Sequence, residues 1–160
     1  YGVEREELRA YAQANCRGLH GIARAFDVFE HMDGRSDNGG ESEARAAMIL
    51  AGVATPELQV EITRPGNAGY YLADYGWQMP NGSWMLAELH GLGKFEDESQ
   101  NDPEHTAAKT YRAALMRDAN LRAMGHNVIH FKLSDTYDVK AFGSMMRGYG
   151  IPTTKPYAGS

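Results

Sequence analysis

The sequence predicts an α/β domain, close to the border with α+β, preceded by a short helical extension. Three segments with the alternating pattern of strands follow one another between residues 57 and 91, and consecutive strands of this kind pair as an antiparallel meander. A helical segment, 104–124, separates them from a fourth strand-like segment, 127–133, which is the pattern of a helical crossover. A chain of 160 residues suffices for one such core and not clearly for two.

The region before this domain is predicted to be helical. Residues 3–15 and 19–32 read as helices, and Gly18 and Gly21 weaken the join between them. The segment "DGRSDNGG", 33–40, is a loop by composition and is the only plausible linker. The sequence therefore divides into a helical extension (residues 1–32), a domain (40–150) and a tail (151–160).

The domain is predicted to begin with a helix over about residues 41–50, because Gly52 just past its end is typical of a helix stop. The next segment, "ELQVEI" at 57–62, alternates as a strand does. The segments "GYYLADYGW" and "SWMLAELHG" are two further strands around a turn that contains Pro80, Asn81 and Gly82.

The second half of the domain is predicted as helix, strand, helix. The long helix begins after Pro103 and ends before Gly125, with Tyr111 and Leu115 among its inward positions. The fourth strand is "NVIHFKL", and "DTYDVKAFGSMMRGYG" is a final short helix before the tail.

Composition excludes several classes of protein. The chain is 42% hydrophobic and 23% charged, as soluble globular domains are, and it has no run of about 18 apolar residues, so we expect no membrane span. Its single cysteine, Cys16, can form neither an internal disulfide nor a thiol-rich zinc site, and a reducing cytoplasm fits best. The chain begins at Tyr1 rather than Met, so we expect a module of a longer protein.

The charge distribution is informative about partners. The net charge of −5 argues against nucleic acid, yet residues 94–104 hold five acids and one base, whereas residues 105–132 hold five bases and one acid. A solvated helix face and a surface for phosphates both fit this basic segment. Its bases are Lys109, Arg112, Arg117, Arg122 and Lys132.

Two acids, Asp74 and Glu88, stand in otherwise aromatic and aliphatic strands on either side of the turn. A two-residue turn at Asn81-Gly82 would send them to opposite faces of the sheet. A three-residue loop, Pro80-Asn81-Gly82, would place them opposite each other, with Cβ atoms roughly 4.5–5.5 Å apart. The three-residue loop is favoured, because Pro suits its first position and Gly the left-handed last one.

Two opposed carboxylates repel unless a cation lies between them, so this register predicts a metal site. His90 shares a face with Glu88 by strand alternation. Carboxylate oxygens alone favour Mg²⁺ or Mn²⁺ over zinc. The alternative is that Asp74 is a strand-end acid and that Glu88 pairs with an arginine.

Four segments carry a resemblance to a known family: "GGESEARAAMILAGVATPELQVEI", "YYLADYGW", "WMLAELHGLGKF" and "RDANLRAMGHNVIHFKLSD". They resemble a bacterial family related to the very-short-patch-repair endonucleases, within the PD-(D/E)xK nuclease superfamily. The match runs from about Gly40 to Tyr137. It implies a restriction-endonuclease-like αβββαβ core and a metal-dependent DNA endonuclease in the cytoplasm, with Mg²⁺ or Mn²⁺ as cofactor.

The resemblance also implies roles for particular residues. Asp74 and Glu88 would hold the metal ion, Glu43 in "SEAR" would complete its shell, and Lys94, with His90 secondary, would stabilise the charge that develops on the phosphate. The residues that would contact DNA phosphates without reading sequence are Lys109, Arg112 and Arg117.

The sequence departs from the family pattern at two points. His90 stands where the superfamily has a lysine, and one cysteine cannot build the zinc site of the true very-short-patch-repair enzymes. A catalytically degenerate nuclease fold, acting as a nucleic-acid-binding or protein-interaction module, is therefore the alternative function.

Overall fold

The computed structural model describes residues 4–90 and 103–154. The chain divides into two units, Tyr1–Arg35 and Ser36–Ser160. None of the helices in these described ranges combines the length and the apolar character that crossing a membrane requires.

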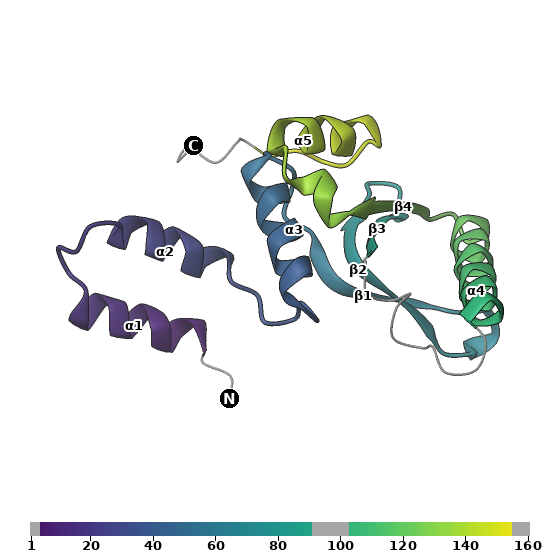
Figure 1. Ribbon diagram of the computed structural model, residues 1–160, viewed down its shortest axis with the longest axis horizontal. Coiled ribbons are helices and arrows are strands. Elements are labelled where there is room, and N and C mark those ends of the chain that lie inside the picture. Colours follow the sequence, from purple (N-terminus) through teal and green to yellow (C-terminus); the bar gives the residue numbers. More distant parts are fainter. Residues whose placement is uncertain (1–3, 91–102, 155–160) are drawn as a thin grey trace. The chain divides into compact units, whose positions relative to one another are not determined.

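The first unit is a pair of helices, α1 (Arg5–Asn15) and α2 (Ile22–His31), which confirms the two predicted helices (Figure 1). Ala12 of α1 is buried, and an ion pair joins Arg9 of α1 to Glu30 of α2. Gly21 in the turn between them has φ +83, a conformation that favours glycine.

The second unit is a four-stranded mixed sheet with helices on both faces, in the order β1-β2-β3-β4 (Figure 1). The first three strands are antiparallel and the fourth is parallel to β3, so the predicted meander and helical crossover are confirmed. The elements are α3 (Gly39–Leu50), β1 (Glu57–Thr63), a short 3-10 turn η1 (Pro65–Asn67), β2 (Tyr70–Gln78), β3 (Trp84–His90), α4 (Pro103–Ala123), β4 (Asn127–Lys132), a second 3-10 turn η2 (Leu133–Thr136) and α5 (Val139–Gly148).

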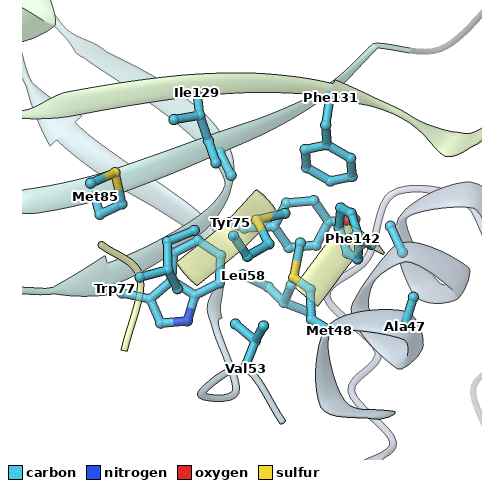
Figure 2. Close-up of a cluster of buried hydrophobic side chains, with 14 residues drawn as sticks. Ala47, Met48, Val53, Leu58, Tyr75, Trp77, Met85, Ile129, Phe131 and Phe142 are labelled. Atoms are coloured by element: carbon cyan, nitrogen blue, oxygen red, sulfur yellow. The ribbon is translucent and has the colours of Figure 1, made fainter. Parts of the chain in front are cut away.

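Two apolar clusters cover the two faces of this sheet. Adjacent residues of β3 belong to different clusters, because neighbouring side chains on a strand point to opposite faces. Met85 and Ala87 face the cluster shared with α3 and α5, which Figure 2 shows around Tyr75 and Phe142. The second cluster lies under α4 and consists of Val60, Ile62, Ala73, Leu86, Leu121 and Val128.

Helix α3 begins at Gly39, two residues before the predicted start. Asn38 is its N-cap, and the Asn38 side chain accepts a hydrogen bond from the backbone N–H of Glu41. The helix ends as predicted: Gly52 has φ +71, and the N–H of Val53 donates to the carbonyl of Met48.

The predicted inward positions of α4 are wrong. Tyr111 and Leu115 are 63% and 51% exposed, whereas Asp118 and Leu121, three residues apart on one face of the helix, are buried. The inward face of α4 therefore carries a buried acid, which an apolar pattern cannot reveal.

The segment that the sequence assigns to a tail pairs with the domain over its described residues. Ile151 is buried, and Val53 and Thr153 form an isolated antiparallel bridge. This contact lies directly after the stop of α3 and adds to the core beneath α3 and α5.

Candidate functional site

The loop between β2 and β3 has the predicted three-residue form. The N–H of Met79 donates to the carbonyl of Ser83 over 2.8 Å, and Gly82 has φ +81. Asn81 completes the loop, because its side-chain oxygen accepts from the backbone N–H of Ser83. Trp77 therefore pairs with Met85, as the predicted register requires.

The regular ladder ends beside the two acids. Its outermost pair is Tyr75 with Ala87, so Asp74 and Glu88 occupy the next positions outward on the two strands. The Asp74 carboxylate does not simply stand on one face of the sheet, because its Oδ2 accepts a hydrogen bond of 2.8 Å from the backbone N–H of Leu89. The Asp74 carboxylate thus accepts the hydrogen bond from Leu89 that a backbone carbonyl would accept in a regular ladder.

The other side of β2 is irregular at the same place. Gln59 of β1 and Asp74 lie between the paired positions Leu58–Tyr75 and Val60–Ala73, and Gln59 has φ +52. A positive φ is uncommon for a residue other than glycine, asparagine or aspartate. The side chains on either side of this point face opposite sides of the sheet: Leu58 and Tyr75 belong to the α3 cluster. Val60 and Ala73 belong to the α4 cluster.

Glu88 is held by an arginine, as the alternative interpretation expected. Arg117 of α4 donates from Nη1 to Oε2 of Glu88 over 3.0 Å, and from Nη2 to both Oε1 of Glu88 and the carbonyl of Leu72. The two side chains are 13% (Glu88) and 25% (Arg117) exposed. Burial raises the pKa of Glu88, while the hydrogen bonds and charge of Arg117 oppose that rise.

Three further polar side chains lie on the same side of the sheet. The ring of His90 stacks on that of His130 with centroids 4.7 Å apart, and His130 is the register partner of Glu88. Nε2 of His130 lies 2.7 Å from a carboxylate oxygen of the buried Asp118. Partial burial and the neighbouring His130 lower the pKa of His90, so His90 is largely neutral at pH 7.

The acid of α3 that lies against the sheet is Glu41 rather than the predicted Glu43. Glu43 is exposed, whereas Glu41 is only 4% exposed. Its carboxylate accepts from the backbone N–H of Asp37, from the Asn38 side chain and from the Gln59 side chain, over 2.8, 2.8 and 3.2 Å. The spacing Asn38-x-x-Glu41 is that of a capping box, and this signal could have identified Glu41.

Tyr75, next to Asp74 on β2, is bonded to the backbone of α3. The Tyr75 hydroxyl donates to the backbone carbonyl of Glu41 over 2.8 Å, inside the α3 cluster. Burial, followed by the charges of Glu41 and Asp74, raises the pKa of Tyr75 strongly, so it stays a neutral donor.

The remaining predicted residues are distributed as follows. Lys109 and Arg112 are exposed on α4, in keeping with a surface role, and Lys94 lies outside the described residues. Over residues 4–90 and 103–154, no three or more His, Cys, Asp or Glu side chains gather as a metal-binding group. The acids that the sequence proposes as ligands are thus a pair, Asp74 and Glu88, with Glu43 apart from them.

Comparisons with known proteins identify relatives without a described activity. A stretch of 66 residues is 39% identical to an uncharacterized protein of Mycobacterium tuberculosis, in strain CDC 1551 / Oshkosh and in strain ATCC 25618 / H37Rv. The stretch covers 41% of this chain and 24% of each relative, so the match spans about a quarter of the length of these relatives. No family model and no solved structure matches the chain.

Proposed function

We propose that this chain is a Mg²⁺- or Mn²⁺-dependent DNA endonuclease of the PD-(D/E)xK type, with a restriction-endonuclease-like core. The observation that carries the proposal is the pair of acids at the open end of the β2–β3 ladder. Asp74 is fixed there by the N–H of Leu89, and Glu88 by a cationic side chain. The order of helix, three antiparallel strands, helix and parallel strand supports it.

The donor set fits a hard divalent cation. Both candidate ligands are carboxylates, the groups that Mg²⁺ and Mn²⁺ prefer. Among the described residues, Asp74 uses only Oδ2 for a hydrogen bond, and Glu88 already binds a cation, the Arg117 guanidinium. When bound, the ion would polarise the phosphate and the attacking water.

The protein groups around the pair have separate tasks in this proposal. Glu41 takes the place of Glu43 as the acid of α3, and it reaches the site through Gln59, which lies beside Asp74 in the sheet. His90 is neutral near pH 7 and orients the attacking water by hydrogen bonding, whereas Lys94 would supply the permanent positive charge.

The basic surface of α4 supplies affinity without sequence readout. Lys109 and Arg112 are exposed and three residues apart, so they lie on one side of the helix. Each would neutralise a phosphate and release counterions, which makes binding depend steeply on salt.

A binding module without catalysis is the second candidate, and one contact favours it. Both oxygens of Glu88 receive hydrogen bonds from Arg117, and His90 replaces the lysine of the superfamily pattern. In a binding module the ion pair would be a permanent structural bond and no metal would enter.

Metal binding and cleavage distinguish the two candidates. The wild-type chain should show saturable thermal stabilisation by Mn²⁺ and Mg²⁺ and should cleave plasmid DNA only in their presence. Asp74→Asn and Glu88→Gln should abolish cleavage, while Glu61→Gln, an exposed acid of β1, should not. A wild-type protein that binds DNA, does not bind metal and does not cleave DNA would favour the binding module.

A further inference from the structure

Arg117 is engaged inside the site rather than displayed on the surface of α4. Its guanidinium donates to both oxygens of Glu88 and to the carbonyl of Leu72, so its contacts come from two neighbouring strands. Its side chain is 25% exposed, whereas Arg112, five residues earlier on α4, is exposed. An arginine with these acceptors is not available to a DNA phosphate, which conflicts with its predicted role.

The charges explain why an arginine stands there. Arg117 supplies one positive charge beside two acids, Asp74 and Glu88, and its bonds go to Glu88. A desolvated carboxylate without a partner is costly, and the bidentate guanidinium is the strongest protein partner for it. A divalent cation on the same oxygens would repel the guanidinium, so the two compete for Glu88.

We propose that Arg117 occupies the cation position of Glu88 in the metal-free protein and is exchanged for the divalent ion when the site is loaded. This inference rests on the proposed function, because it takes Glu88 as a metal ligand. The released guanidinium remains on α4 beside the site, where the phosphate of a bound DNA strand becomes its next acceptor. The ion pair therefore keeps the empty site folded and lowers its affinity for metal.

The test compares metal affinities without DNA. Mn²⁺ and Mg²⁺ are titrated by calorimetry and thermal shift into the wild-type chain, Arg117→Gln, and Arg112→Gln as a control with the same change in net charge. Arg117→Gln should bind Mn²⁺ roughly tenfold more tightly, equivalent to about 1.4 kcal/mol. Its metal-free melting temperature should fall, and Mn²⁺ should raise it by more than in the wild type. Arg112→Gln should match the wild type.

The outcomes separate this inference from the proposed function. Equal or weaker Mn²⁺ affinity in Arg117→Gln overturns the exchange, even if the wild type is an active nuclease. Tighter binding in a protein that never cleaves DNA keeps the exchange and removes the nuclease, and no metal binding by any variant removes both. If Arg117→Gln does not fold, Arg117→Lys replaces it. Lysine keeps the positive charge but loses the bidentate geometry, so Arg117→Lys should bind Mn²⁺ more tightly than the wild type, with a smaller gain than expected for Arg117→Gln. A Mn²⁺ affinity equal to that of the wild type overturns the exchange.

Discussion

Replacing Glu41 by glutamine tests which acid of α3 is part of the folded core. The carboxylate accepts hydrogen bonds from Asp37 and Gln59 at Oε2 and from Asn38 at Oε1. Glutamine keeps one acceptor oxygen, so its amide must face at least one donor, and a buried donor without a partner costs about 1–3 kcal/mol. Losing a negative charge in the first turn of the helix adds about 0.3–1 kcal/mol. We therefore expect the free energy of unfolding to fall by about 2–3 kcal/mol.

The matched control is Glu43→Gln, which removes the same charge two residues later from an exposed position. It should change the free energy of unfolding by less than about 0.5 kcal/mol. Urea unfolding followed by circular dichroism measures both values, and Glu41→Gln should also lower the melting temperature by roughly 5–10 °C. A Glu43 variant as destabilised as the Glu41 variant, or a neutral Glu41 variant, would refute the assignment of Glu41 as the buried acid.

Three other changes have defined outcomes. Lys109→Ala and Arg112→Ala should each lower the slope of log affinity against log salt concentration for DNA by about 1, and slopes equal to wild type would refute a phosphate role. Burial lowers the pKa of His126, which accepts a hydrogen bond from the N–H of Trp84, so the unfolded state protonates first. The contribution of His126 to the free energy of unfolding should therefore be fully present above about pH 6.5 and be lost as the pH falls below it. Urea unfolding at pH 7.5 and 5.5 should show a smaller loss of stability in His126→Asn than in the wild type, and an equal loss in both proteins would contradict this. Gln59→Gly should have a free energy of unfolding about 1 kcal/mol higher than Gln59→Ala, measured by urea unfolding, because only glycine relieves the positive φ. An alanine variant as stable as the glycine variant would show that the backbone at Gln59 is not strained.

The order of elements and the hairpin register could be predicted because both depend on residues close in sequence. The loop needed only a proline, an asparagine and a glycine in the right positions, and Gly82 does adopt the left-handed conformation. The inward face of α4 could not be predicted in this way, because a buried acid stands in it. Asp118 is buried because His130, twelve residues later on β4, gives it a partner.

The identity of the arginine that binds Glu88 could not be predicted from neighbouring residues either. Arg117 follows Glu88 by 29 residues and reaches it only because α4 packs across β2 and β3. Strand alternation is also a reliable guide only where the ladder is regular. It predicts that Asp74 and Glu88 share a face, but the ladder has ended at Tyr75, and the Asp74 carboxylate turns towards the N–H of Leu89. The sequence could therefore identify the acids, and an arginine as one possible partner of Glu88, but not which arginine.

The irregularity at Gln59 has two explanations that are compatible. The register of β1 and β2 is unbroken here, with Gln59 and Asp74 as one residue on each strand between paired positions. The twist at this point lets β1 and β2 contribute to both apolar clusters, since Leu58 and Val60 face opposite sides of the sheet although they are two residues apart. That alone would not require a polar residue with a strained backbone. Gln59 also bonds the buried Glu41 and lies beside Asp74, and strained positions concentrate where a site must be held in one geometry. The same irregular position that distributes the core thus holds Gln59, which bonds an acid of α3, next to the acid of β2 on which the proposed site depends.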